Sequence, residues 1–238
     1  MRLRGSGAGP RRLGLRERPG YVPRMPTLDT FLFDLDGTLI DSVQLILDSY
    51  HHTLAAHGQP PRSDAQWLAG VGTPLTAQFA DWKDDAGTME ALIETYRRYN
   101  LANHDRMVRA FPGVVAAVRA IRAQGRKTGL VTSKNRPGAL RGLKLVGLDD
   151  AMDVLVCADD VTNPKPHPEP VNKAVSLLAA EPARTVYVGD SIHDLVSGRG
   201  AGVRTAAVLW GPFTRNQLEP AQPDFWLDRP EQLMSLLD

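Results

Sequence analysis

The chain is poor in cysteine, in aromatic residues and in long apolar runs, and these shortages limit the classes of protein to which it can belong. It contains one cysteine, Cys157, among 238 residues, and aromatic residues make up only 6%. A single cysteine excludes an internal disulfide and is typical of a reducing compartment, so we expect a cytoplasmic location. No apolar run approaches the roughly 20 residues that a membrane helix needs. The formal net charge of +1 gives no reason to expect nucleic acid or a membrane surface as a partner.

The positive charge that the chain does carry is concentrated at its start. Residues 1–26 contain seven arginines and one acidic residue, Glu17, among many glycines and prolines. This composition predicts a flexible basic arm with no core of its own. The arm also lacks the apolar centre of a secretory signal. Met25 lies just before the first predicted strand and would serve as a natural start, so we assign the arm no function.

Two patterns of apolar residues divide the rest of the chain. Residues 30–35 are predicted to form a buried strand, because Phe31, Leu32 and Phe33 are continuously apolar before Asp-Gly ends the run. From residue 42 to 110 the apolar spacing is helical, and no convincing strand interrupts it. Strands are then predicted at 127–132, 154–158, 185–188 and 205–208, alternating with helices at 114–124, 137–145, 168–180 and 191–200.

Alternating strands and helices predict an α/β fold with a doubly wound parallel sheet and a Rossmann-like core. The helical block is then an insertion after the first strand. We therefore divide the chain into the arm (1–26), an α/β core (27–41 and 111–238) and the inserted helical block (42–110). Folds of this kind bind ligands beyond the carboxyl ends of their strands.

Chemically capable side chains lie at these strand ends. The first strand is followed by two carboxylates two positions apart, Asp34 and Asp36, which would share one face of a strand and repel each other. The other strand ends and loops carry Thr132, Ser133 and Lys134, then Lys165, and then Asp190 with Asp194 four residues on. Since carboxyl ends of parallel strands meet at one edge, we expect all of these residues on one rim.

The acidic residues of this rim suit a divalent cation. Asp34, Asp36 and Asp190 form a cluster of hard oxygen ligands of the kind that Mg²⁺ prefers, and the cation would cancel their repulsion. An aspartate beside such an ion can attack phosphorus and form an aspartyl-phosphate. Lys165 would stabilise the transferring phosphoryl group, Thr132 would donate its hydroxyl, and the second aspartate would exchange protons with the leaving group and water.

Four segments of this rim resemble, in order, the motifs of the haloacid dehalogenase-like superfamily: Asp34-Leu-Asp-Gly-Thr-Leu, Val131-Thr-Ser-Lys134, Lys165-Pro and Gly189-Asp-Ser-Ile-His-Asp194. The resemblance implies roles for the residues within them: Asp34 as nucleophile, Asp36 as general acid/base, Thr132 as phosphate binder and Lys165 as charge clamp. It also implies that Mg²⁺ is held by Asp34, the Asp36 carbonyl and Asp190, with Asp194 in support.

The resemblance extends to the phosphate contacts and to the helical block. Thr132, Ser133, Lys134 and the backbone of Gly37 would bind the substrate phosphate. Ser133 stands where many members carry asparagine, a position that acts largely through its backbone N–H. The block 42–110 resembles the helical cap that many members insert after the first motif, which closes over the site, excludes water and selects the substrate.

Three interpretations of the reaction follow from the resemblance. A β-phosphoglucomutase-like sugar phosphomutase shares all four motifs, but its cap stretch of Arg-Gly-x-Ser type is absent from residues 69–75. That loop, and Pro223-Asp-Phe-Trp-Leu-Asp, resemble phosphoglycolate phosphatases and related pyrophosphatases. We therefore expect a phosphatase that acts on a small phosphorylated metabolite as a monomer or homodimer. A true dehalogenase is the third interpretation, and Asp36 and the acidic residues argue against it because it would need neither the second aspartate nor a metal. Outside the enzymes, a non-catalytic phosphate-binding regulatory protein is a separate interpretation, which the joint presence of Asp34 and Asp36 disfavours.

Overall fold

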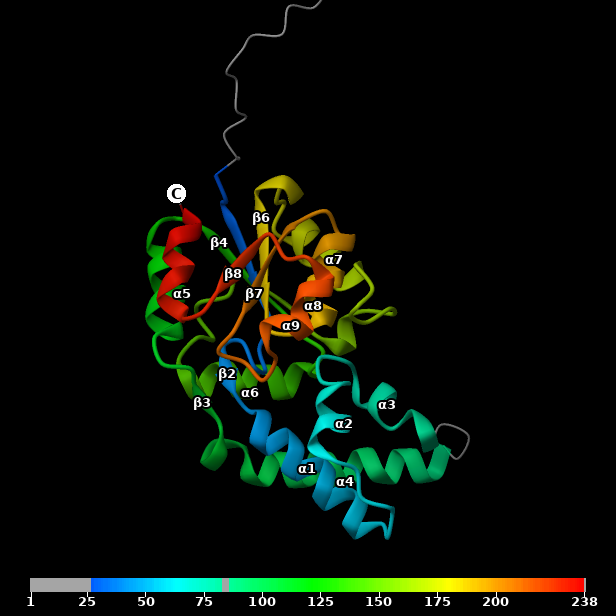
Figure 1. Ribbon diagram of the computed structural model, residues 1–238. Helices are drawn as coiled ribbons and strands as arrows, with labels where there is room; N and C mark the ends of the chain where they lie inside the picture. Colours follow the sequence, from blue (N-terminus) through cyan, green and yellow to red (C-terminus); the bar gives the residue numbers. More distant parts are fainter. Residues whose placement is uncertain (1–26, 83–85, 238) are drawn as a thin grey trace, which may run out of the picture.

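The computed structural model describes residues 27–82 and 86–237, so the predicted basic arm lies outside the described residues. The centre of the fold is a six-stranded sheet with the order β5-β4-β1-β6-β7-β8, and all neighbouring strands are parallel (Figure 1). Its strands are β1 (Thr30–Phe33), β4 (Lys127–Val131), β5 (Val154–Val156), β6 (Thr185–Gly189), β7 (Arg204–Val208) and β8 (Phe225–Leu227). The predicted doubly wound α/β core is confirmed.

Helices cover both faces of the sheet, because each strand buries alternate side chains on opposite faces. They are α5 (Val114–Ala123), α6 (Arg136–Val146), α7 (Glu169–Leu177), α8 (Ile192–Gly200), α9 (Arg215–Leu218) and the 3₁₀ segment η5 (Pro230–Leu237). Phe31 and Phe33 of β1 pack in one apolar cluster with α5, α6 and η5. Leu32, between them, packs in a second cluster with α7. Cys157 is buried in the first cluster, as a core thiol.

The inserted block forms four helices and a short 3₁₀ turn below the sheet edge in Figure 1. They are α1 (Val43–Ala56), α2 (Asp64–Leu68), α3 (Leu75–Gln78), η1 (Ala80–Trp82) and α4 (Ala86–Met107). The block has its own aromatic core, in which the rings of Tyr50 and Trp67 stack at 4.2 Å and Phe79 and Tyr96 are buried. An antiparallel pair, β2 (Ile40–Asp41) with β3 (Arg109–Ala110), brings the entry and exit of the block together. We therefore propose that the inserted block is a cap domain and that it extends from residue 42 to residue 110.

Three short strands are not predicted by the sequence. β2 and β3 have two residues each and β8 has three, which is too short for an apolar periodicity to show. The strand predicted at 154–158 ends at Val156, because residues 158–160 form a 3₁₀ turn. The helix predicted at 168–180 ends at Leu177, just before Ala179 adopts a positive φ of 45°. Within residues 27–82 and 86–237 no helix is both long and apolar enough to cross a membrane.

Candidate active site

The predicted rim lies at the carboxyl ends of the three central strands. Phe33 at the end of β1 is aligned with Leu130 of β4 and Val188 of β6, so the residues that follow in each strand meet at one edge. The amide of Asp34 donates to the Val188 carbonyl oxygen at 2.9 Å, one residue before Gly189-Asp190. The order of the strands thus brings together residues more than 150 positions apart.

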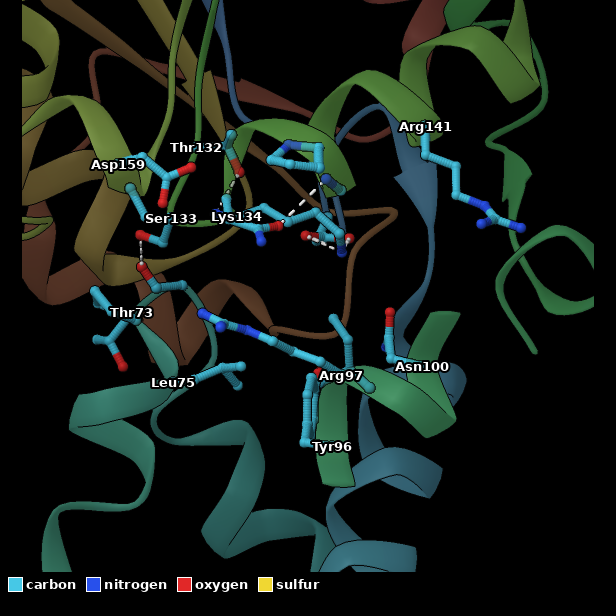
Figure 2. Close-up of a pocket in the computed structure, with 18 of the residues that line it drawn as sticks. Thr73, Leu75, Tyr96, Arg97, Asn100, Thr132, Ser133, Lys134, Arg141 and Asp159 are labelled. Atoms are coloured by element: carbon cyan, nitrogen blue, oxygen red, sulfur yellow. Dashed lines mark hydrogen bonds and ion pairs between the residues drawn. The ribbon is translucent and has the colours of Figure 1, made fainter. Parts of the chain in front are cut away.

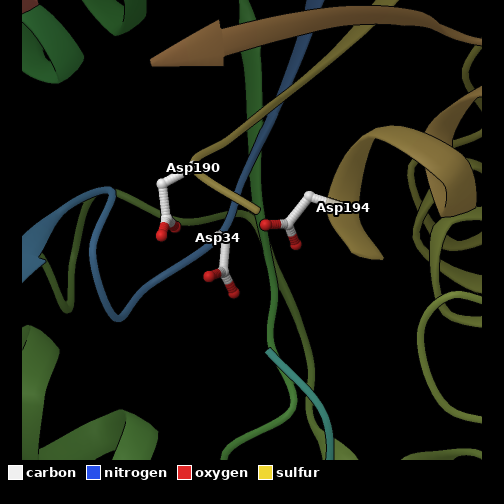
Figure 3. Close-up of side chains that lie close together, drawn as sticks. All are labelled: Asp34, Asp190 and Asp194. Atoms are coloured by element: carbon white, nitrogen blue, oxygen red, sulfur yellow. The ribbon is translucent and has the colours of Figure 1, made fainter. Parts of the chain in front are cut away.

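Three buried carboxylates converge at this edge (Figure 3). One oxygen from each of Asp34, Asp190 and Asp194 lies within 4.8 Å of the others. Asp190 Oδ1 accepts a hydrogen bond from Thr38 Oγ1 at 2.9 Å, whereas its buried Oδ2 has no partner among the described residues. Burial raises the pKa of Asp190 well above its ordinary value, and Asp194 and Asp34 raise it further. A buried oxygen without a partner inside an acidic cluster fits a divalent cation with oxygen ligands.

Lys165 lies beneath this cluster and is almost completely buried, at 2% exposure. Its Nζ donates to Asp34 Oδ1 at 2.8 Å, to Asp194 Oδ1 at 2.6 Å and to the Tyr187 hydroxyl at 3.1 Å. Burial alone would lower the pKa of Lys165, but the two carboxylates outweigh it and raise the pKa, so the lysine stays charged.

The two carboxylates that pair with Lys165 differ in their environment. Burial raises the pKa of Asp34 to about 7, with Lys165 opposing it. Burial would also raise the pKa of Asp194, but Lys165, Ser191 and Tyr187 outweigh it, so that pKa lies below its ordinary value. All oxygens of Asp194 are engaged: Oδ1 by Lys165 and Tyr187, and Oδ2 by the amide and hydroxyl of Ser191. This agrees with a supporting role rather than a direct ligand role.

Asp36 has a separate set of partners. Lys134 Nζ lies 2.9 and 3.0 Å from its two carboxylate oxygens, and Ser42 Oγ donates to Oδ1 at 2.6 Å. Burial raises the pKa of Asp36, but Lys134 and Ser42 outweigh it and the net shift is downward. β1 ends at Phe33, so the expectation that Asp34 and Asp36 share one strand face is wrong. Each carboxylate has its own lysine, which relieves the repulsion expected for the pair.

The carboxylate of Asp36 is therefore not part of the acidic cluster of Asp34, Asp190 and Asp194. The metal contact implied by the resemblance goes through its backbone carbonyl, and that contact stays a prediction. Gly37, next in the chain, has a φ of 84°, and a Cβ added there would lie 2.5 Å from Asp190 Oδ2. Its amide donates to the Ile40 carbonyl oxygen at 2.9 Å. The glycine thus permits close approach to Asp190, and the phosphate contact expected of Gly37 stays a prediction.

The predicted phosphate binders that follow β4 line the cleft beside the inserted block. Thr132 is buried, and its Oγ1 accepts from the Lys134 amide at 3.2 Å, which leaves the hydroxyl hydrogen available to donate. Ser133 Oγ donates to the Gly72 carbonyl oxygen at 2.6 Å, so its side chain holds the loop that carries Gly72. A Cβ added to Gly72 would lie 2.9 Å from Ser191 Oγ, which shows how closely this loop packs on the core.

A cleft of about 1150 Å³ opens between the core rim and the helical block. Five of the predicted site residues line it: Asp34, Asp36, Thr132, Ser133 and Lys134. The opposite wall comes from the block and includes Thr73, Leu75, Tyr96, Arg97 and Asn100 (Figure 2). Lys165, Asp190 and Asp194 do not line the cleft but are buried behind Asp34. Asp34 is thus the carboxylate of the acidic cluster that lines the cleft, with Lys165, Asp190 and Asp194 behind it.

Three polar residues of the site are not singled out by the sequence reasoning. Thr38 lies within the first motif segment and donates to Asp190, and Ser42 lies three residues after that segment and donates to Asp36, so their closeness to the motif was an available signal. Tyr187 lies inside an apolar strand, where its hydroxyl contacts Lys165, the Asp194 carboxylate and, at 2.8 Å, the Val131 carbonyl oxygen. Nothing local distinguishes it from an ordinary core tyrosine.

Comparison with known proteins agrees with this geometry. The family profile of haloacid dehalogenase-like hydrolases matches residues 31–208. The pyrophosphatase PpaX of Bacillus cereus (strain B4264) is 43% identical over 212 residues, covering 88% of this chain and 96% of the relative.

Two solved structures share the fold. A haloacid dehalogenase-like hydrolase from Bacteroides fragilis superimposes with a TM-score of 0.80 at 27% identity, covering 87% of this chain and 99% of the other. A predicted phosphoglycolate phosphatase from Haemophilus somnus gives a TM-score of 0.81 at 22% identity, covering 90% and 100%, which supports the fold alone. The four motifs, the site geometry and these matches agree, and the chain therefore belongs to the haloacid dehalogenase-like hydrolase family.

Proposed function

We propose that this protein is a Mg²⁺-dependent phosphatase that hydrolyses a small phosphorylated metabolite through an aspartyl-phosphate on Asp34. The observation that carries the proposal is the position of Asp34: it lines the cleft, and Lys165 and the acidic cluster lie directly behind it. A site that only binds phosphate has no need of an aspartate paired with a buried lysine and a second aspartate in the same cleft. The 43% identity to PpaX, a pyrophosphatase, supports the same class of reaction.

The chain's own residues account for the transfer step. An Asp34 oxygen forms a bond to phosphorus while the bond from phosphorus to the leaving oxygen breaks. Lys165, at 2.8 Å from Asp34 Oδ1, stabilises negative charge on the carboxylate and on the transferring group. Asp36 gives a proton to the leaving oxygen as that bond breaks and then takes one from the water that releases phosphate from Asp34, and its hydrogen bond from Ser42 orients it for this.

Asp34 and Asp190 supply the oxygen atoms that would hold Mg²⁺, with Asp194 fixing Lys165 beside them. The bound cation would neutralise the cluster and the phosphate oxygens, and would keep Asp34 ionised although burial raises its pKa to about 7. Thr38 fixes Asp190 through the hydrogen bond to Oδ1, and Oδ2, which has no partner among the described residues, would be available to bind the cation.

Removal of divalent cations should abolish phosphate release, and Mg²⁺ should restore it. The reason is that, among the described residues, Lys165 is the one cation that pairs with the three buried carboxylates, and one carboxylate oxygen has no partner. The measurement is phosphate release after EDTA treatment and dialysis, followed by titration with Mg²⁺. Ca²⁺, which prefers more ligands and a looser geometry, serves as the comparison ion. Full activity in EDTA would refute the metal site.

The substrate class rests on the loop 69–75 and on the relatives. The loop offers no arginine or serine for a sugar, and a compact anion such as pyrophosphate or phosphoglycolate needs few further contacts. The cleft of about 1150 Å³ exceeds the size of either anion, so volume alone does not select them over a hexose phosphate. Directed contacts, rather than space, must select the substrate.

A panel of phosphorylated metabolites with Mg²⁺ tests this choice. We expect kcat/KM for pyrophosphate or phosphoglycolate to exceed that for β-glucose 1-phosphate by at least about tenfold, a difference of about 1.4 kcal/mol in transition-state binding. NMR of the glucose phosphates tests the alternative, a phosphomutase. Conversion of glucose 1-phosphate to glucose 6-phosphate without phosphate release would favour the mutase over the phosphatase. The cytoplasmic location, the monomer or homodimer, and the absence of nucleic-acid or membrane partners stay predictions.

A further inference from the structure

Arg97, a cation in the cleft, has no hydrogen-bond or ion-pair partner among the residues that the structure describes. Arg97 of α4 lines the cleft that Asp34 opens into, and its side chain is exposed. Figure 2 shows it reaching from the helical block across the cleft toward the loop that carries Ser133 and Lys134. Among residues 27–82 and 86–237, no acceptor forms a hydrogen bond or ion pair with its guanidinium. Its charge is therefore free to meet a ligand.

The other cations around the cleft are occupied or distant. Lys134 pairs with both oxygens of Asp36, and Arg141 pairs with Asp105 at 2.8 and 2.9 Å. Lys144 lies near the far end of α6, roughly 13 Å along the helix axis from Asn135 at its start. Lys144 therefore lies away from the end of α6 that follows Lys134, and Arg97 is, among the described residues, the unpaired cation on the wall that the helical block contributes opposite the core rim.

The position of Arg97 on α4 explains why it faces the site. The residues of α4 that line the cleft recur at spacings of three and four, as one helix face requires: Ile93, Tyr96, Arg97, Asn100, Leu101 and Asp105. Tyr96 is buried in the aromatic core of the block, which fixes this face toward the rim. Arg98, the next residue, is exposed and does not line the cleft.

We propose that Arg97 binds the second anionic group of a two-headed substrate, whose reacting phosphoryl group lies at Asp34 and whose other end is a carboxylate or a phosphate. A planar guanidinium can bind either group with two parallel hydrogen bonds. The proposal rests on the proposed phosphatase function and narrows its substrate class. It also supplies the directed contact that the loop 69–75 lacks.

Comparing substrates that have a second anionic group with a substrate that lacks one distinguishes substrate binding by Arg97 from a structural role. With Arg97→Ala we expect kcat/KM for phosphoglycolate and pyrophosphate to fall by about 10- to 100-fold, the loss typical of a hydrogen bond to a charged group. p-Nitrophenyl phosphate, which has no second anionic group, should change by less than about twofold. Arg97→Lys should recover part of the loss, because a point charge replaces the planar contact. Arg98→Ala is the matched control and should resemble the wild type.

A binding measurement decides the proposal independently of turnover. Calorimetric titration of Asp34→Asn with phosphoglycolate and with methyl phosphate, both with Mg²⁺, should show tighter binding of phosphoglycolate. Adding Arg97→Ala should remove that preference. Equal losses for both ligands, or no loss for either, would refute the role of Arg97 and leave the phosphatase intact. Absence of all phosphate release by the wild type, with the binding preference present, would refute the phosphatase function and leave the Arg97 contact intact.

Discussion

Replacement of Asp34 by asparagine should abolish turnover. We expect kcat to fall by at least about 1000-fold, because the carboxamide keeps the shape of the side chain but cannot attack phosphorus. The fold should survive, since the amide oxygen can still accept from Lys165, which lies 2.8 Å from Asp34 Oδ1. Phosphate release from pyrophosphate and phosphoglycolate is the measurement. A retained rate of one tenth, equal to about 1.4 kcal/mol of barrier, would contradict covalent catalysis through Asp34.

Three further variants test whether the loss of turnover is specific to Asp34 as the nucleophile. Asp41→Asn changes an exposed aspartate of β2 and should keep wild-type activity. Asp36→Asn keeps the nucleophile but removes the proton acceptor, so the phosphorylated protein should accumulate and be detectable by mass spectrometry after rapid acid quench. The double variant Asp34→Asn/Asp36→Asn should show no such adduct. An adduct that persists without Asp34 would place the phosphoryl group on another residue.

The rim of the site could be predicted from the sequence because its residues follow strand ends, and strand ends have local signals. The apolar run Phe31–Phe33 stops at Asp34, and β6 stops at Gly189 before Asp190. Once the strands are parallel and share a sheet, their carboxyl ends must meet. The strand order then brings Asp34 and Asp190 within reach of one ion, although they are far apart in the sequence.

The partner of each side chain could not be predicted, because it depends on distant backbone. Lys134 is 98 positions from Asp36, and nothing near either residue indicates that they pair. The same holds for Tyr187, whose hydroxyl reaches the Val131 carbonyl oxygen 56 positions away. A free Lys134 would contact the phosphate, as the sequence suggests, whereas the paired one first neutralises Asp36.

Which residues of the helical block face the site could not be predicted from the sequence either. A helical period predicts that Arg97 and Asn100 share a face, but it does not say which face of α4 meets the core. In the sequence alone, Arg98, Arg106 and Arg109 are as good candidates for a substrate contact as Arg97. The packing of α1 against α4, and of the block on the rim, places Arg97 in the cleft and leaves the other three outside it. Substrate selection by a cap therefore depends on tertiary contacts that a single sequence does not encode locally.

Replacement of Lys165 by methionine should cause the second large effect, on both turnover and stability. The variant leaves Asp34 and Asp194 buried without their shared cation, at contacts that are 2.8 and 2.6 Å in the wild type. Removing one partner of a buried ion pair costs about 3–5 kcal/mol of the free energy of unfolding. Turnover should fall at least about 100-fold, because charge on the phosphoryl group loses its buried donor. Lys173→Met, on the exposed face of α7, is the matched control and should change stability by less than about 0.5 kcal/mol.

The pH dependence of the free energy of unfolding lost in Lys165→Met shows whether the lost ion pair or lost packing is the cause. In the wild type, the lowered pKa of Asp194 contributes stability that is present above its unfolded-state pKa and is lost as pH falls through the folded-state pKa. In Lys165→Met the unpaired, buried Asp194 should instead have a raised pKa, so the folded state takes up a proton and gains stability as pH falls. Urea unfolding in EDTA should therefore show a larger difference between the two proteins at about pH 8 than at about pH 5. An equal difference at both pH values would mean that Lys165 stabilises the fold by packing, and its assignment as the charge partner of the nucleophile would have to be withdrawn.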